Sequence, residues 1–211
     1  IELEWTGGAV QAFDEEQYKA HEQSIASITT ACAQVGLDYP VNMLSREEFA
    51  GMVPDIEVGE DVTGVMYTAD QGHVNPLKLL AAVRCAFQQK GGVYLGGHSV
   101  TSITPDKSGS ITVKMSGGTY SCGKLVVAAG HGSLRLLHPF GVKLHIDPQR
   151  GQLMVTERYK RVLNIPVLCT RQTPDGTFLI GLSTEDTALD SSVTLPAMKN
   201  QASNAVLLFP I

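Results

Sequence analysis

Apolar and polar residues recur with regular periods along the first third of the chain, and these periods predict its first elements. Residues 1–5 alternate as a half-buried strand does. A helix is predicted from the N-cap Asp14 to Val35, because apolar residues recur on one face and Gly36 follows as a stop. The run from Ser45 to Glu48 is a capping box, which predicts a second, short helix.

Strand signals dominate the middle of the chain. Residues 62–69 are rich in β-branched and aromatic side chains and predict a strand. Asn75 and Pro76 form an N-cap and a first helical residue, so a helix is predicted to start there and to end at the glycine pair 91–92. Short turn sequences then separate three segments and predict a β-meander. The three segments are residues 99–104, 111–115 and 119–127.

A single apolar run, residues 125–129, has the character of a strand buried on both faces. Gly130 and Gly132 follow it, and three leucines then open a predicted helix. Glycines at such a turn let the backbone pass close to another group, often a phosphate at a helix N-terminus, although packing of the turn alone explains them equally well. Further strands are predicted at 142–146, 151–156, 167–172 and 177–182, and a last helix at 196–208.

Strands outnumber helices, and short turns join most of them. We therefore expect an α+β fold with a large antiparallel or mixed sheet. A chain of 211 residues is long enough for one domain, or two small ones, with proper cores.

Composition narrows the range of partners. A net charge of −5 without a lysine or arginine cluster argues against nucleic acid as the main partner. No apolar run approaches the roughly 20 residues that a membrane-spanning helix needs. Four cysteines lie far apart without a Cys-x-x-Cys pair, which favours reduced thiols in the cytoplasm, with disulfides left open. The cysteines are Cys32, Cys85, Cys122 and Cys169.

Several kinds of catalytic site are not indicated. His131 and Ser133 lack the Gly-x-Ser-x-Gly elbow of a serine hydrolase, and no histidine spacing matches a metal site. We accordingly expect no metal and assign no catalytic side chain. The other histidines, His73 among them, are interpreted as surface or hydrogen-bonded core residues. Both ends of the sequence are apolar, so we expect a piece of a longer protein.

Four motifs follow one another in a characteristic order. They are Gly72-His-Val-Asn-Pro-Leu77, the run 124–137, Arg150-Gly-Gln152 and the segment 176–181. This succession resembles the D-amino-acid oxidase-like family of FAD-dependent oxidoreductases, which includes glycine oxidases, sarcosine oxidases and dehydrogenases of opines or D-hydroxyproline. The chain resembles the middle of such a protein, without either of the family's two glycine-rich FAD loops.

The resemblance implies a division of the chain and a reaction. Residues 1–72 and 141–211 would form most of a substrate domain, and residues 73–140 part of an FAD-binding α/β domain with a crossover helix and a three-stranded meander. The reaction would oxidise the C–N bond of an amino acid or secondary amine by hydride transfer to FAD. Partner subunits for electron transfer and a peripheral place at the inner membrane are left open. The 211 residues alone are not expected to retain FAD or activity.

The resemblance also implies roles for particular residues. Val100 would hold the adenine through backbone groups, Ala129 and Gly130 would lie beside the ADP part of FAD, and Arg171 would bind the substrate carboxylate. The segment Arg150-Gly151-Gln152 would belong to the strand nearest the flavin ring.

Each of these residues also has a purely structural interpretation. Val100 could be plain core, the glycines could serve packing, Arg150 could be solvated, and Arg171 could pair with a surface carboxylate. His131 departs from the small residue that is usual after this glycine in the family. The alternative for the whole chain is a β-rich binding or interaction module without a cofactor.

Overall fold

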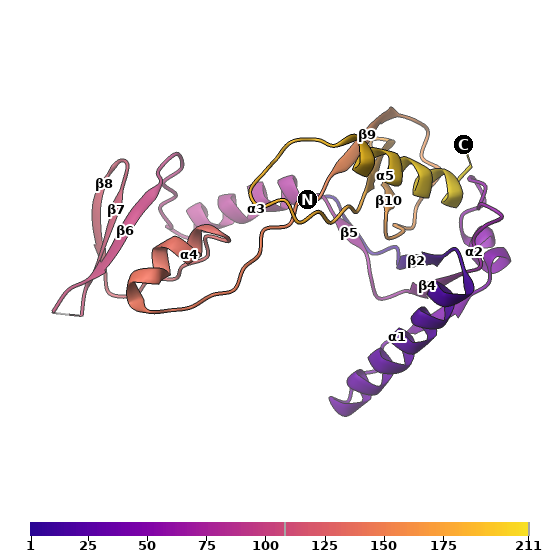
Figure 1. The fold of residues 1–211 in the computed structure, drawn as a ribbon, viewed down its shortest axis with the longest axis horizontal. Helices are drawn as coiled ribbons and strands as arrows, with labels where there is room; N and C mark the ends of the chain where they lie inside the picture. Colours follow the sequence, from indigo (N-terminus) through magenta and orange to yellow (C-terminus); the bar gives the residue numbers. More distant parts are fainter. Residues whose placement is uncertain (108, 211) are drawn as a thin grey trace. The chain divides into compact units, whose positions relative to one another are not determined.

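The computed structural model describes residues 1–107 and 109–210, which form two compact units. The first unit comprises residues 1–82, residues 150–185 and the described residues from 190 onward. The second unit comprises residues 83–149 and 186–189. Segments from both ends of the chain therefore build the first unit, where indigo and purple ribbon lies beside orange and yellow in Figure 1.

Two three-stranded antiparallel sheets form the centre of the first unit. In one, β4 (Gly64–Thr68) lies between β2 (Gly8–Ala12) and β3 (Val41–Leu44). In the other, β11 (Thr177–Gly181) lies between β9 (Leu153–Arg158) and β10 (Thr170–Gln172). A parallel bridge between Ala9 and Val167 joins the two sheets. The predicted α+β fold with antiparallel and mixed pairing is thereby confirmed.

The helices of the first unit begin where the sequence predicts them to begin. Asp14 accepts a hydrogen bond from the Gln17 amide at 2.7 Å and caps α1 (Glu15–Gln34). Ser45 and Glu48 form the predicted capping box of α2 (Arg46–Met52). The last helix, α5 (Leu195–Leu208), lies along the sheet of β9 and β11, whereas much of α1 extends away from β2 and β4 (Figure 1).

The core of the first unit lies between α2, the sheet and the end of α5. Its most deeply buried apolar side chains are at most 2% exposed: Phe49, Val53, Val65, Leu163, Leu208 and Phe209. Burial of each such side chain contributes about 1.5–3 kcal/mol to stability. Gly59 secures the end of α5, because its amide donates to the Leu208 carbonyl at 2.9 Å and a Cβ there would overlap the Leu207 carbonyl oxygen.

The amide side chain of Gln172 is buried, with 1% of its surface exposed, and all its hydrogen-bonding capacity is used. Its Oε1 accepts from the backbone amides of Val162 and Leu163 at 2.8 and 3.0 Å. Its Nε2 donates to the carbonyls of Lys160 and Gly176 at 2.9 and 3.0 Å. Gln172 thus fixes the loop before β10 and the turn after it to the strand itself.

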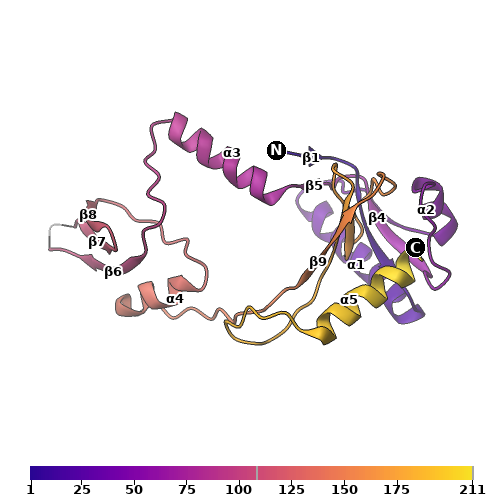
Figure 2. The same cartoon turned by 90° about the horizontal axis from the view of Figure 1, so that it is seen from above.

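In the second unit the predicted three-stranded meander is confirmed as β6 (Val100–Pro105), β7 (Ile111–Met115) and β8 (Gly118–Cys122) (Figure 2). Its third strand ends at Cys122, whereas the prediction extended it to residue 127. The short helix α4 (Gly132–Leu137) and the 3-10 turn η1 (His138–Phe140) follow. The helix α3 (Pro76–Gln89) is capped as predicted, since Asn75 Oδ1 accepts from the amides of Leu77 and Lys78. A short antiparallel pair, β1 (Leu3–Glu4) with β5 (His73–Val74), completes the first unit.

The strand predicted at residues 125–129 is not formed. These residues adopt no regular structure, and Val126 is 88% exposed. A strand buried on both faces needs a hydrogen-bonded neighbour, and no described segment pairs with this one. The predictions of a strand at 142–146 and of a β10 beginning at Val167 were also wrong, since only residues 170–172 form that strand.

The amide of Gln172 provides a test of how this part of the first unit is held together. Gln172→Leu keeps the volume of the side chain but leaves the backbone amides of Val162 and Leu163 without their acceptor and removes one donor from each of two carbonyls, so we expect a loss of about 3 kcal/mol in the free energy of unfolding. Urea unfolding measures this loss. The exposed Gln23→Leu on α1 is the matched control and is expected to change little. Equal effects of the two substitutions would refute the role of Gln172.

Candidate functional site

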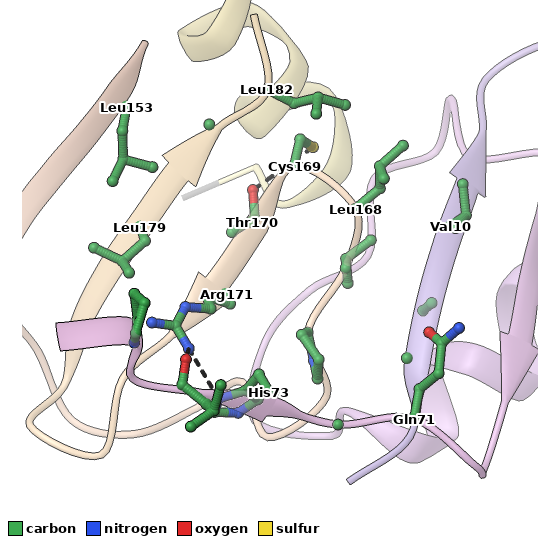
Figure 3. Close-up of a pocket in the computed structure, with 18 residues that line it drawn as sticks. Val10, Gln71, His73, Leu153, Leu168, Cys169, Thr170, Arg171, Leu179 and Leu182 are labelled. Atoms are coloured by element: carbon green, nitrogen blue, oxygen red, sulfur yellow. Dashed lines mark hydrogen bonds between the residues drawn. The ribbon is translucent and has the colours of Figure 1, made fainter. Parts of the chain in front are cut away.

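A pocket of about 590 Å³ opens in the first unit (Figure 3). Its walls come from the start of β2, the segment around β5, the stretch leading into β10, and parts of β9 and β11. Most side chains that line it are apolar; the larger aliphatic ones are Val10, Val74, Leu153, Val167, Leu168, Leu179 and Leu182. Such a wall suits the apolar part of a small molecule.

Arg171 lines this pocket and is the one arginine, lysine or carboxylate among the lining residues that the structure describes. In β10, side chains alternate between the two faces of the strand. Thr170 and Gln172 are buried, whereas Arg171 is half-buried and lies opposite Leu179 of β11. The strand therefore presents the guanidinium on the pocket side, as Figure 3 shows.

The guanidinium of Arg171 has neutral partners. Its Nη1 lies 3.0 Å from His73 Nδ1 and donates a longer hydrogen bond, of 3.4 Å, to the Val74 carbonyl. Within residues 1–107 and 109–210, Arg171 forms no ion pair and its Nε and Nη2 donate no hydrogen bond. An arginine has five N–H donors in a planar fork, so this one retains the donors for a carboxylate ligand. The alternative of a surface pair with a carboxylate does not describe this residue.

His73 lies beneath Arg171, and its side chain is 9% exposed. Its Nε2 is 3.7 Å from Glu4 Oε2, and Arg161 in turn donates to both oxygens of Glu4. Burial lowers the pKa of His73 below 6.5, and the nearby charges of Arg171 and Arg161 lower it further against the opposing effect of Glu4. The lowered pKa therefore favours the neutral imidazole.

Arg150 is bound internally and is not solvated. Its side chain, 8% exposed, forms two parallel hydrogen bonds of 3.1 Å with Glu185, and its Nη1 donates to Asp190 at 2.9 Å and to Ser192 at 3.1 Å. The backbones of Arg150 and Glu185 also exchange two hydrogen bonds. Arg150 is thus neutralised by its own chain.

Gln152 belongs to the same network. Its side chain donates to Glu185 and Thr194 and accepts from the Thr194 amide, and its carbonyl accepts from Gln201. Between the two lies Gly151, at whose position a Cβ would come within 3.4 Å of the Ser183 carbonyl oxygen. Arg150, Gly151 and Gln152 therefore fasten the segment 183–194 to the start of β9, and none of them lines the pocket.

The candidates in the second unit are brought close to one another. The carbonyl of Val100 accepts from Arg135 Nη2 at 3.0 Å, so Arg135 ties β6 to α4. The amide of Ala129 donates to Ser133 Oγ at 3.2 Å. Gly130 has a φ of +53°, and no heavy atom lies within 4 Å of the place where its Cβ would be. The turn at Ala129 and Gly130 is thus open on that side.

The sequence interpretation assigned no functional role to several residues of these networks, among them His73, Arg135, Gln172 and Glu185. Sequence alone offers a weak signal for Gln172, because a long polar residue beside an arginine in a buried strand has to face the opposite side. For His73 and Glu185 no local signal exists, since their partners are 98 and 35 residues away.

Comparison with known proteins identifies the family. The model of the DAO family, described as FAD dependent oxidoreductase, matches residues 1–211. The chain therefore belongs to this family, which confirms the resemblance seen in its motifs. Among the described helices, none has both the length and the apolar character needed to cross a membrane.

Individual relatives agree with this assignment. The chain is 31% identical over 214 residues to a subunit of the opine oxidase of Agrobacterium tumefaciens, covering all of this chain and 55% of that protein. It is 28% identical to the HcnC subunit of hydrogen cyanide synthase from Pseudomonas aeruginosa, covering all of this chain and 50% of that protein. The structure of glycine oxidase from Geobacillus kaustophilus shares the fold, with a TM-score of 0.85 at 24% identity, over 100% of this chain and 56% of that one. The chain spans about half the length of the curated relatives it matches.

The network around Arg150 predicts a pH dependence of stability. Hydrogen bonds from Arg150, Gln152 and Thr194 lower the pKa of Glu185 from 4.5 to about 2, against the opposing effect of partial burial. The folded state thus binds fewer protons than the unfolded state between these values, so the stabilisation is complete above pH 4.5 and is lost as the pH falls towards 2. Glu185→Gln should therefore destabilise the protein at about pH 7 and much less at about pH 3.

Urea unfolding at the two pH values measures this difference. Glu16→Gln, at an exposed position on α1, serves as the control and should leave stability unchanged at both. A deficit of Glu185→Gln that stays constant with pH would show that the carboxylate charge is not what the network uses.

Proposed function

We propose that the protein, as a member of this family of FAD-dependent oxidoreductases, oxidises the C–N bond of a carboxylated amine, and that Arg171 holds the carboxylate. One observation carries the proposal. Among the described residues, the guanidinium of Arg171 has no carboxylate partner, and it lies in a pocket whose other large side chains are mostly apolar. A charged group in such a place is costly unless it serves a ligand of opposite charge.

The residues of this chain would contribute by binding and orientation. When bound, FAD supplies the acceptor for the hydride that leaves the carbon beside the amine nitrogen. Arg171 would fix the carboxylate with two parallel hydrogen bonds, which limits the rotation of the substrate. The apolar wall that includes Leu153, Leu168 and Leu179 would hold the carbon skeleton and exclude water. No side chain of the pocket is required as a general base in this scheme.

The second unit offers a place for the nucleotide part of FAD. The left-handed conformation of Gly130 and the open space beside it suit a backbone that a cofactor approaches closely. In the proposed arrangement Ala129 and Gly130 lie beside the ADP part, and Val100 holds the adenine through its backbone. Arg135 would keep the Val100 strand and the Gly130 turn together, since it bonds β6 from α4.

The segment Arg150-Gly151-Gln152 is proposed to border the flavin ring. Its two polar side chains are occupied by Glu185 and Thr194, so the contribution would come from a rigid backbone and not from free side-chain donors. In the same proposal residues 1–72 and 141–211 belong to the substrate domain and residues 73–140 to the FAD-binding domain.

Substrate and partners are proposed at the level of chemical class. An amino acid or a secondary amine with one carboxylate fits the single arginine. The relatives from opine oxidase and from hydrogen cyanide synthase are both named as subunits, which supports partner subunits for electron transfer here. The four cysteines, all free in the structure, support a cytoplasmic location. Nothing in the comparisons favours the alternative of a cofactor-free binding module.

The role of Arg171 is testable by a conservative substitution. In the full-length enzyme, Arg171→Lys retains the charge but loses the planar fork, so we expect kcat/KM for a carboxylated amine to fall roughly 30-fold, which corresponds to about 2 kcal/mol of transition-state stabilisation. Turnover of an amine without the carboxylate should change little. Steady-state kinetics on a matched pair of substrates, such as proline and pyrrolidine, measures the difference.

Arg158→Lys is the matched control, because Arg158 ends β9 with a side chain that is 76% exposed and pairs only with Asp175 among the described residues. It should leave both substrates unaffected. If Arg171→Lys reduces turnover of both substrates equally, or of neither, the arginine is not the carboxylate anchor.

The role of Gly130 is tested by cofactor content. In the full-length enzyme, Gly130→Val introduces a branched side chain into the open space, so we expect the holoprotein to lose most of its FAD. Gly141→Val is the matched control, since Gly141 also has a positive φ, of 72°, and open space around it. Backbone strain should then destabilise both variants, but only Gly130→Val should lower the ratio of FAD to protein, measured by absorbance after gel filtration. Equal FAD content would contradict the assignment.

A further inference from the structure

The side chain next to the proposed carboxylate anchor is His73, a residue that the assignment of function leaves without a task. It belongs to β5, whereas Arg171 belongs to β10, and the contact between Nδ1 and Nη1 measures 3.0 Å. Figure 3 shows the imidazole beside the guanidinium at one end of the pocket. Both residues are pocket-lining, so the contact lies within the site.

The chemistry of the contact determines the protonation of the ring. A guanidinium nitrogen can only donate, so His73 Nδ1 has to accept and therefore carries no proton. The proton of the neutral ring is then on Nε2, which lies 3.7 Å from the Glu4 carboxylate. Glu4 itself is held by two hydrogen bonds from Arg161. A chain of four side chains thus runs from Arg161 through Glu4 and His73 to Arg171.

The charges around His73 favour this neutral form. Arg171 approaches from β10 and Arg161 from the loop before it, and Glu4 on β1 is the opposing negative charge. Protonation of Nδ1 would place a donor against a donor, so the hydrogen bond to Arg171 exists only with the neutral ring. Neutral His73 orients a cation without cancelling its charge, which a carboxylate in the same position would do.

We propose that His73, in its Nε2-protonated tautomer, is a positioning residue that holds the Arg171 guanidinium in the orientation that binds a carboxylate. This inference rests on the proposed function of Arg171. A neutral acceptor fixes one Nη1 donor and leaves Nε and Nη2 for the ligand. Glu4 and Arg161 act through His73 by fixing its tautomer and ring orientation.

The first test observes the ring directly. The holoprotein is labelled with ¹⁵N-histidine, and His73→Asn assigns the signal. We expect long-range ¹H–¹⁵N spectra at neutral pH to show a bare Nδ1 and a protonated Nε2 for His73, with a pKa below 6.5. In Arg171→Leu this pKa should rise, because the charge of the arginine is gone. A proton on Nδ1 at neutral pH would overturn the proposal, whatever the kinetics of Arg171→Lys.

The second test uses propionate as the carboxylate and propionamide as its uncharged counterpart. Propionate should shift the His73 ring signals of the wild type, and propionamide should not. In Arg171→Leu neither compound should shift them. If propionate binds the wild type and Arg171→Leu equally well, Arg171 is not the carboxylate anchor and its proposed function fails. The tautomer of His73, measured in the first test, does not depend on that outcome.

Two substitutions separate positioning from packing. His73→Asn retains an acceptor near the position of Nδ1, whereas His73→Phe retains the ring and loses the acceptor. We expect the Kd of propionate to rise about tenfold in His73→Phe and to stay within about threefold in His73→Asn. The exposed His138→Asn, outside the pocket, should bind as the wild type does. Equal losses in the two His73 variants, or none in either, would refute the positioning role. If His73→Phe does not fold, the tautomer of His73 and the Kd of propionate for His73→Asn decide whether His73 is a positioning residue.

Discussion

The four hydrogen bonds of the buried Gln172 amide are the constraint on which the candidate site depends. They tie the loop at residues 160–163 and the turn at Gly176 to β10, so this three-residue strand has a fixed position and a fixed rotation. Because neighbouring side chains of a strand point to opposite faces, an inward Gln172 requires an outward Arg171. The guanidinium of Arg171 thus reaches the pocket from a rigid strand. Gln172 holds that strand in place, so the hydrogen bonds of Arg171 are not needed for this purpose.

The first unit contains two partly buried arginines, and only one of them has carboxylate partners among the described residues. Arg150 is surrounded by Glu185, Asp190 and Ser192, and its charge is used to fasten one segment of its own chain to another. Arg171 has an imidazole and a carbonyl as partners, so its charge is not compensated within the described residues. Internal ion pairs of the first kind stabilise a fold and attract no ligand, whereas an oriented, uncompensated cation in an apolar pocket favours an anion. The two arginines thus differ in their partners and not in their burial, and this difference assigns Arg150 to the scaffold and Arg171 to the candidate site.

The second unit depends more on single turns than on a core. Few of its side chains are buried, and the apolar run at residues 125–129 lies exposed beside the open turn at Gly130. On the helix that follows this turn, Arg135 donates one hydrogen bond to the Val100 carbonyl of β6, and Ser133 accepts one from the Ala129 amide. Val100 and the turn at Ala129 and Gly130 therefore lie near one another within this unit, although the strand that was expected to lead into the turn is not formed.

The sequence by itself determined what depends on neighbours within a few residues. Caps at Asp14, Ser45 and Asn75, the order of the strands in the meander and the motif order that identified the family were all readable, because their physical causes are local. The position of Arg171 was inferred from that resemblance, but its free guanidinium was not visible in the sequence. Tertiary structure alone decided that Arg150 is neutralised, that residues 125–129 lack a paired strand, and that His73 meets Arg171 across 98 residues. Such contacts arise from chain topology, and no local period or propensity encodes which distant side chain a charge will find.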